Sequence, residues 1–270
     1  MRILFVGDVM GRSGRDAVAK HLPVLKKSLK IDCAIVDADN AAHGLGVTES
    51  NCKEFYEAGA DCITTGNHVW DQREIIPYIG RDPKLIRAIN FPKGTTGNSS
   101  FLFTTPSGER VLITHALARL FMENLDCPFT GMDELLKDYK LGQNVDAIFV
   151  DFHGEATSEK NAFAHYLDGR VSAVVGTHTH MPTADCQVFD GGTGYQTDAG
   201  MTGDYNSVIG VRKDIPIHRF VKKTPSERLV PADGEATFCG TFVETNAKGL
   251  CTRIEPIIVG PRLQNHTPAV

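Results

Sequence analysis

The stretch DAIFVDFHGEATSEKNAFAHYLDGRVSAVVGTH, residues 146–178, decides the fold class. Its two apolar runs, "DAIFVDFH" and "VSAVVGTH", predict strands, and "SEKNAFAHYLD" between them predicts a helix. A strand, a crossover helix and a second strand form the repeating unit of a parallel sheet that carries helices on its face. The stretch therefore predicts an α/β fold.

The N-terminal part of the chain repeats this alternation. The runs "RILFVGD", "CAIVDADN" and "DCITTGNH" predict strands, separated by predicted helices, the second of which opens at Thr48 as its N-cap. Residues 85–121 change to short predicted strands, and the last third is expected to be mostly β, including "SVIGV" and "HRFVK". We expect a single domain over residues 1–270, with two sheets that each carry helices on the outer face.

The overall composition is that of an ordinary globular protein. The chain has 28 lysines and arginines against 33 acidic residues, so no basic footprint indicates duplex nucleic acid. No window approaches the about 18 consecutive apolar residues of a transmembrane helix, and "MRILFVGDVMG" is too short for a signal peptide. The seven cysteines form no CxxC pair and have no predicted catalytic role. These features predict a cytoplasmic protein without membrane contact.

Polar side chains follow five of the predicted strands. They are Asp8, Asp39 with Asn40, Asn67 with His68, His153, and His178 with His180. Ligands of parallel α/β sheets bind at the carboxyl ends of strands, so we expect these groups to meet. Each alone has a simple alternative as a turn residue, and the HxH pair could be polar residues on a strand end. Because all five strand ends carry side chains that can bind a metal, their combination favours a metal site.

The kinds of side chain narrow the choice of metal. Carboxylates, amides and imidazoles without a thiolate suit Mn²⁺, Fe or Zn²⁺. Six or seven candidates exceed the needs of one four-coordinate ion. They suit two ions about 3.5–4 Å apart that share a bridging carboxylate, as in enzymes of in-line displacement at phosphorus.

The motifs resemble those of the calcineurin-like metallophosphoesterase superfamily. "GD" at residues 7–8, "GNH" at residues 66–68 and "GTHTH" at residues 176–180 occur in its order. The longer stretches "GDVMGRSGR", "GNHVWD", "DFHGEATSEK", "VVGTHTHMPTAD" and "TDAGMTGDYNSVIG" are similar to its YmdB-like branch, bacterial proteins with phosphodiesterase activity on cyclic nucleotides. This resemblance covers residues 7–210 and implies a two-sheet α/β/β/α sandwich.

The resemblance also implies roles for the strand-end residues. Asp8 and His180 would hold the first metal, Asn67, His153 and His178 the second, and Asp39 would bridge the two. Asn40 would complete the shell of the first metal. The expected ions are two divalent or trivalent cations, Fe or Mn in the first place and Zn²⁺ as an alternative. The family's tendency to assemble implies a homo-oligomer.

The sequence departs from the branch at two positions. Position 39 carries Asp where the branch usually has Glu, so a shorter side chain must span the two ions. His115 in "THALARLFM" stands where the branch is expected to have Asn and a Gly-Arg pair, and we interpret it as a satisfied polar residue beside a strand.

The expected reaction is hydrolysis of a phosphodiester, with a 2′,3′- or 3′,5′-cyclic nucleotide as substrate. A hydroxide that bridges the ions would attack phosphorus, and His68 is the candidate general acid because it follows a ligand and imidazole exchanges protons near neutral pH. Arg12 and His43 are weaker candidates for substrate contact, with a surface turn and a solvated loop as the alternatives.

Two other functions compete with this hypothesis. One is a non-catalytic regulator that binds metal or nucleotide. The other is a metal-dependent amidohydrolase, in which HxH lies early on a (β/α)₈ barrel. The late HxH and the β-rich last third favour the phosphodiesterase.

Overall fold

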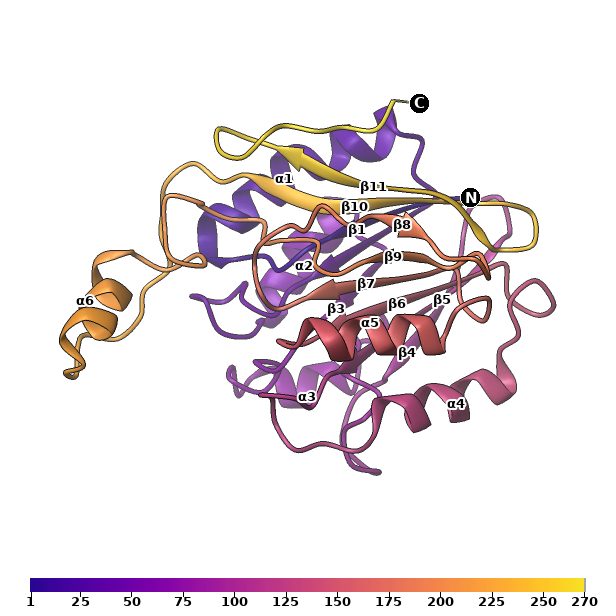
Figure 1. Cartoon of the computed structure of the whole chain (residues 1–270), viewed down its shortest axis with the longest axis horizontal. Helices are drawn as coiled ribbons and strands as arrows, with labels where there is room; N and C mark the ends of the chain where they lie inside the picture. The colour runs from indigo at the N-terminus through magenta and orange to yellow at the C-terminus, as the bar shows by residue number, and fades with distance from the viewer. Residues whose placement is uncertain (270) are drawn as a thin grey trace.

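Two open sheets, stacked face to face, form the centre of the computed structural model, which describes residues 1–269 (Figure 1). The first sheet has the order β11–β10–β1–β2–β3, and the second has the order β4–β5–β6–β7–β9–β8. The first consists of β1 (Arg2–Val6), β2 (Cys33–Asp37), β3 (Cys62–Thr64), β10 (Phe238–Thr245) and β11 (Cys251–Val259). The second consists of β4 (Ser100–Thr104), β5 (Arg110–Leu117), β6 (Ala147–His153), β7 (Ala173–Thr177), β8 (Gln187–Val188) and β9 (Gly194–Gln196).

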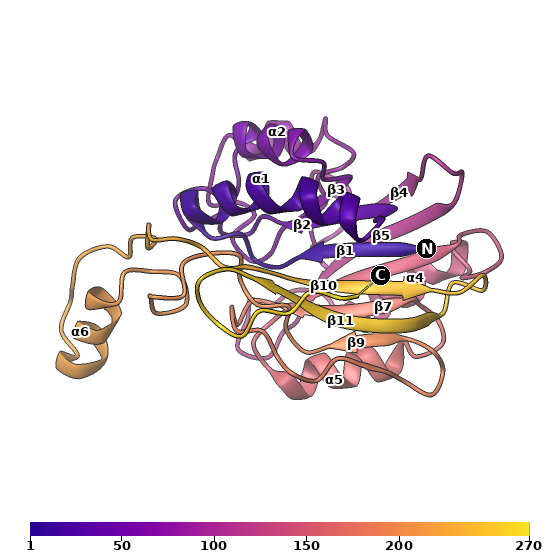
Figure 2. The ribbon, with the colours of Figure 1, turned by 90° about the horizontal axis from the view of Figure 1, so that it is seen from above.

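Helices cover the outer faces of both sheets (Figure 2). The first sheet carries α1 (Gly11–Ser28), α2 (Glu49–Glu57) and α3 (Ile75–Ile79), and the second carries α4 (Pro128–Asp138) and α5 (Thr157–Tyr166). The predicted α/β/β/α sandwich is confirmed. Thr48 caps α2 as expected, since its side chain accepts a hydrogen bond from the Asn51 N–H.

Alternation along the strands produces three apolar layers. Ile3 and Phe5 of β1 lie between the sheets, whereas Leu4 and Val6 pack under the helices of the first sheet. On the second sheet, Phe152 turns outward and stacks on Phe163 of α5 with ring centroids 3.9 Å apart. Burial on both faces explains why the strands read as nearly continuous apolar runs.

The last third contains a helix that the sequence interpretation missed. The segment "HRFVK", expected as a strand, lies in α6 (Asp214–Lys222), and "SVIGV" forms only an isolated bridge between Val208 and Val211. Pro216 has no N–H for a strand ladder but is tolerated in a first helical turn. Asp214 in the first turn and Lys222 in the last match the helix dipole. The strand prediction for this segment was wrong.

Two open sheets are incompatible with a (β/α)₈ barrel. The amidohydrolase alternative depended on that barrel and is therefore excluded by the sheet topology. Among residues 1–269, no helix combines the length and the apolar character that a membrane crossing requires.

The outer layer of the second sheet can be tested by truncating Phe163. This side chain is fully buried between Phe152 and Phe129, so Phe163→Ala should lower the free energy of unfolding by about 3–5 kcal/mol in urea denaturation. Phe220→Ala removes a ring that is 70% exposed and should change the free energy of unfolding by less than about 0.5 kcal/mol. Equal effects of the two changes would contradict the layer assignment.

Candidate functional site

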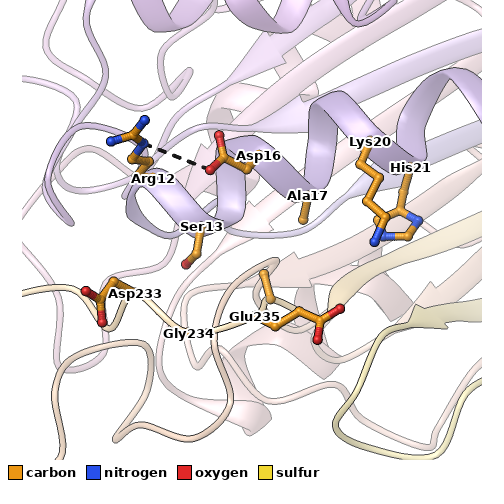
Figure 3. Close-up of a pocket in the computed structure, with 10 residues that line it drawn as sticks. Arg12, Ser13, Asp16, Ala17, Lys20, His21, Asp233, Gly234 and Glu235 are labelled. Carbon is orange, nitrogen blue, oxygen red and sulfur yellow. Dashed lines mark ion pairs between the residues drawn. The ribbon is translucent and has the colours of Figure 1, made fainter.

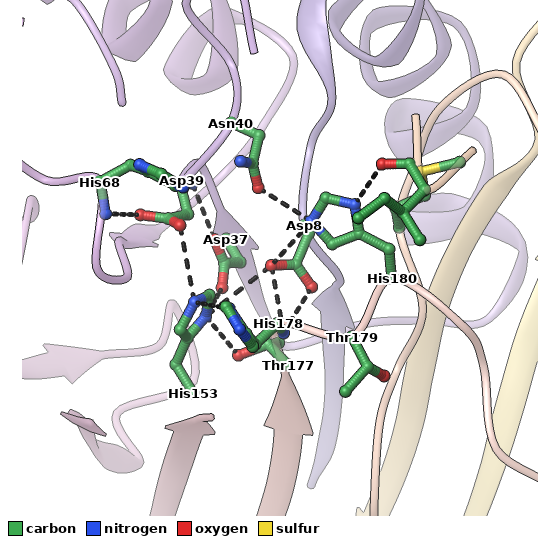
Figure 4. A network of polar contacts seen from close by, with 12 residues as sticks. Asp8, Asp37, Asp39, Asn40, His68, His153, Thr177, His178, Thr179 and His180 are labelled. Carbon is green, nitrogen blue, oxygen red and sulfur yellow. Dashed lines mark hydrogen bonds and ion pairs between the residues drawn. The ribbon is translucent and has the colours of Figure 1, made fainter. Parts of the chain in front are cut away.

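The polar side chains at the strand ends converge on one site (Figure 4). Asp8 follows β1, Asp39 follows β2, Asn67 follows β3, His153 ends β6 and His178 follows β7. Within each sheet these carboxyl ends lie at one edge, because β1, β2 and β3 are parallel to one another, as are β5, β6 and β7. The contacts of His153 with Asn67 and Asp39 bring the two edges together. The site thus joins residues from both sheets.

One group of ligand-type atoms surrounds Nε2 of His153. It lies 3.0 Å from Oδ1 of Asn67, 3.1 Å from Nδ1 of His178 and 3.5 Å from Oδ2 of Asp39. The hydrogen bonds on the other side of the ring fix its protonation. Thr177 donates its hydroxyl proton to Asp151 and therefore accepts from Nδ1–H of His153, 3.0 Å away. Nε2 consequently presents a lone pair to two oxygen acceptors.

A second group surrounds Nε2 of His180. Nδ1 of this ring lies 2.8 Å from the carbonyl oxygen of Ile209 and so carries the proton, which leaves a lone pair on Nε2. That atom lies 3.1 Å from Oδ1 of Asn40 and 3.8 Å from Oδ1 of Asp8. The amide of Asn40 is oriented by its NH₂ group, which donates to the carbonyl of Gly44. Acceptors facing one another at such distances are suited to a shared cation.

Buried carboxylates dominate the electrostatics of the site. Asp8, Asp37, Asp39 and Asp151 are at most 1% exposed, and within the described chain no lysine or arginine lies within 4.0 Å of them. Burial raises the pKa of Asp8 to about 7 and raises the pKa of Asp37 and of Asp39 well above the ordinary value. A bound cation would remove this desolvation penalty.

The imidazoles respond to burial in the opposite direction. Burial lowers the pKa of His178 to about 4 and lowers that of His153 well below its usual range. Both rings are therefore neutral at neutral pH, which is the form that binds metal. The donor set of neutral imidazoles, amide oxygens and carboxylates fits Mn²⁺, Fe or Zn²⁺.

The HxH pair lies on a left-handed loop and not on the strand. β7 ends at Thr177, and the φ angles of His178 and His180 are 96° and 66°. Non-glycine residues persist in this region only where their surroundings hold them. The N–H of His178 points at the Asp8 carboxylate, at 3.2 Å from Oδ2, so the loop backbone is fixed against the first strand.

A buried ion pair braces the same loop, and the sequence interpretation gave its lysine no role. Lys160 of α5 is 1% exposed, and its ammonium donates to the carbonyl of Thr177 and to Asp198. Asp198 also accepts the N–H and the hydroxyl of Thr179. The signal was the position of Lys160 on the apolar face of its helix, three and four residues before Phe163 and Ala164.

The sequence interpretation also gave no role to two buried acids, Asp37 and Asp151. Asp37, Asp8 and His153 together present ligand atoms within 4.8 Å of one another. Asp37 faces Nδ1 of His153 at 3.6 Å and accepts the N–H of Asp39, while Asp151 accepts from Thr177. The period of two was the available signal, since each acid lies two residues before a predicted ligand on a strand.

His115 differs from its interpretation as a satisfied polar residue. It lies within β5, is 0% exposed, and neither ring nitrogen has a hydrogen-bond partner among residues 1–269. Nδ1 lies 3.3 Å from Oδ2 of Asp151, and the ring packs against His153. It therefore belongs to the layer of residues directly behind the strand-end site.

His68 lines the cleft over this site. The cleft encloses about 340 Å³, and its lining includes Asp39, Asn40, His178 and His180. The His68 N–H donates to Asp39, and its Nδ1 lies 2.7 Å from Oδ2 of Asp71. The other ring nitrogen, Nε2, has no such partner in the described structure and is left for a ligand.

The two predicted substrate contacts lie elsewhere. Arg12 lines a separate cleft between α1 and residues 233–236, where its side chain is 85% exposed and 4.0 Å from Asp16 (Figure 3). His43, with φ 54°, lines a smaller cleft beside the one that contains His68. The geometry brings together the predicted ligands and His68 but does not bring Arg12 to them.

Comparison with known proteins agrees with the motifs and the fold. Residues 4–257 match the family model described as YmdB-like protein. The chain belongs to the YmdB-like family. This match, together with the names of the relatives below, a 2′,3′-cyclic-nucleotide 2′-phosphodiesterase and a phosphatase, confirms the enzyme class implied by the resemblance, a hydrolytic phosphoesterase.

Relatives of this YmdB-like chain are similar over nearly their whole length. A 2′,3′-cyclic-nucleotide 2′-phosphodiesterase of Bacillus subtilis is 42% identical over 96% of this chain and 97% of that protein. A crystal structure of a hypothetical protein from Thermus thermophilus has a TM-score of 0.90 at 40% identity, covering 97% of this chain and 100% of the other. A novel phosphatase from Mycoplasma pneumoniae has a TM-score of 0.88 at 32% identity, covering 96% and 93%.

The electrostatics of this family member predict an unusual effect of replacing Asp8. An unfolded Asp loses its proton near pH 4, whereas buried Asp8 has a pKa of about 7. The folded state thus holds more protons between these values, so stability falls as pH rises from about 4 to 7. In EDTA, Asp8→Asn should raise Tm at pH 8 and change it little at pH 4.

Asp133→Asn provides the control. This exposed carboxylate accepts hydrogen bonds from Tyr166 and Arg170, and the Tyr166 bond lowers its pKa, so neutralising it should lower Tm slightly at pH 8. A lowered Tm for Asp8→Asn at pH 8 without metal would contradict the buried-carboxylate argument.

Proposed function

We propose that the protein is a dinuclear metal-dependent phosphodiesterase that hydrolyses 2′,3′-cyclic nucleotides. The name of the Bacillus subtilis relative supports this choice over the 3′,5′-cyclic alternative. The observation that carries the proposal is the convergence of lone-pair donors in two groups, around Nε2 of His153 and around Nε2 of His180. Two groups with facing acceptors fit two cations better than one.

The two groups divide the predicted ligands. Asp8, Asn40 and His180 would hold one ion, and Asn67, His153 and His178 the other. Asp39 would contact both; its Oδ2 faces Nε2 of His153 at 3.5 Å, and its Oδ1 accepts the His68 N–H. Bound cations supply positive charge to the phosphate oxygens and lower the pKa of an attacking water.

His68 would donate a proton to the leaving oxygen. Its Nδ1 is engaged by Asp71, which orients the ring and leaves Nε2 at the cleft. His68 is next to the ligand Asn67 but contacts the metal group only through its backbone N–H, so its side chain can serve the substrate. Acid catalysis at a positioned histidine contributes roughly 10²–10⁴-fold to a rate.

A panel of substrates tests the proposal. Protein reconstituted with Mn²⁺, Fe²⁺ or Zn²⁺ should hydrolyse adenosine 2′,3′-cyclic phosphate faster than adenosine 3′,5′-cyclic phosphate and faster than p-nitrophenyl phosphate, a monoester. Metal analysis of the same preparation should give about two ions per chain. Tight binding of the cyclic nucleotide without turnover would favour the non-catalytic regulator. The predicted self-association stays a prediction, to be measured by sedimentation on the same sample.

The role of His68 predicts a separation of rate from metal content. His68→Ala should lower kcat roughly 10²–10⁴-fold while the metal content stays that of the wild type. Asp71→Asn should cause a smaller loss, because it removes the carboxylate that orients the ring through Nδ1. His266→Ala, remote from the cleft, is the control. Loss of metal from His68→Ala would make this side chain a ligand.

Asp39 and Asp37 can be distinguished by the same measurements. If Asp39 bridges the ions, Asp39→Asn should lower the metal content below two per chain and abolish turnover. Asp37→Asn should keep both ions, because Asp37 faces Nδ1 of His153, the protonated side of the ring. The reverse pattern would assign the metal to the group of Asp8, Asp37 and His153 and contradict the proposed ligand set.

A further inference from the structure

A second cleft adjoins the one that holds the candidate metal centre. It encloses about 260 Å³, and Arg219 and Arg228 belong to its lining. The two clefts share a wall made of Gly44, Leu45, Val211 and Leu229. A ligand whose scissile phosphate lies at the strand ends can therefore extend over this largely apolar wall toward the two guanidinium groups.

Both arginines belong to an arm that projects from the body of the molecule. The arm, residues 212–228, includes α6 and extends beyond the ends of the strands, at the opposite side of the molecule from the N-terminus of β1 (Figures 1 and 2). It contains six lysines and arginines against two acidic residues, whereas acidic residues outnumber basic ones in the whole chain. Positive charge is thus concentrated beside the site in an otherwise acidic protein.

The two arginines differ in their engagement. Arg219 donates to the hydroxyl of Ser226 and to the carbonyl of Glu227, which ties the helix to the returning segment of the arm. The Arg228 guanidinium forms no ion pair or hydrogen bond with any of residues 1–269. It is an exposed cation at the rim of a cleft that leads to the metal centre.

Exposed apolar side chains lie beside cations on α6. Phe220 is 70% exposed and Val221 is 68% exposed, on a helix that also carries Arg219 and Lys222. An aromatic ring among cations is the arrangement on which single-stranded nucleic acid binds, by stacking of bases and pairing of phosphates. The cleft of the arm is continuous with the cleft over the strand ends, so a ligand that places its phosphate there presents an anion to which the cations of the arm are complementary.

We propose that the arm binds the nucleotides preceding the scissile group, so that the preferred substrate is a single-stranded oligoribonucleotide ending in a 2′,3′-cyclic phosphate. Arg228 and Arg219 contact the phosphate next to the terminal nucleoside, and Leu45, Val211 and Leu229 lie under that nucleoside. This inference rests on the proposed phosphodiesterase function and names its substrate class. It differs from binding of duplex nucleic acid, for which the chain as a whole lacks the charge.

The kinetic test compares four substrates. They are adenosine 2′,3′-cyclic phosphate, the same compound with a 5′-phosphate, and the dinucleotide and hexanucleotide of adenosine with the same cyclic terminus. A charge-assisted contact to one added phosphate should raise kcat/KM about 10–100-fold from the mononucleotide to the dinucleotide. Rising KCl should reduce this gain.

Three matched arginine variants test which side chain causes the rise in kcat/KM from the mononucleotide to the dinucleotide. Arg228→Gln should remove about tenfold of it and leave kcat/KM for the mononucleotide unchanged. Arg219→Gln should remove more, because it also loosens the arm. Arg212→Gln is the control, since Arg212 lies on the same arm but pairs with Asp214 and lines neither cleft, so its gain should match the wild type.

A binding measurement separates failure of the inference from failure of the proposed function. Fluorescence anisotropy with a 5′-labelled hexaadenylate should show weaker binding to Arg228→Gln than to Arg212→Gln, whether or not the protein turns over. Equal kcat/KM for the mononucleotide and the dinucleotide would overturn the inference and leave the function intact. If the mononucleotide with a 5′-phosphate reached the kcat/KM of the hexanucleotide, the proposal of an oligonucleotide substrate would be overturned. A change of oligomeric state in Arg228→Gln without a change of preference would overturn it in favour of a second copy.

Discussion

Lone pairs that face one another in a buried site are the constraint on which the rest of the structure depends. Nε2 of His153 and Nε2 of His180 are deprotonated because their Nδ1 atoms donate to Thr177 and to Ile209, and each then faces an amide or carboxylate oxygen. Four buried carboxylates lie beside these rings with no lysine or arginine of residues 1–269 within 4.0 Å, and burial raises the pKa of Asp8, Asp37 and Asp39. Such an arrangement is unfavourable by itself and becomes favourable when cations occupy it. Under the proposed function, the protein gives up stability without metal in exchange for a site that can bind it.

The two sheets bring this constraint about by close packing at their carboxyl ends. Gly66 precedes Asn67, and a Cβ atom there would lie 2.5 Å from both Asp39 and His153, so only glycine lets the three strand ends meet. The loop after β7 is held in a left-handed conformation by Asp8 on one side and by the Lys160–Asp198 pair on the other. Breaking a buried pair leaves an uncompensated charge, which makes this brace part of the site although it touches no predicted ligand side chain.

Much of the candidate site could be predicted from the sequence, because the predicted ligands lie at the ends of strands with a strong apolar pattern. Parallel strands bring their ends together, so the order of Asp8, Asp39, Asn67, His153 and His178 was enough to expect one site. Asp37, Asp151 and Lys160 could not be assigned in this way, since their roles depend on burial between layers, which alternation alone indicates only weakly. The strand predicted for "HRFVK" failed because α6 projects from the body, where no neighbouring strand exists to pair with it. The surroundings of His115 could not be predicted either, because its contact with Asp151 depends on the pairing of two neighbouring strands of one sheet.

Anomalous diffraction from crystals grown with Mn²⁺ tests the central claim most directly. The account predicts two separate manganese peaks on either side of the Asp39 carboxylate, one beside Nε2 of His180 and the other beside Nε2 of His153. A single peak between Asp37 and Nδ1 of His153, or no peak at the strand ends, would contradict it.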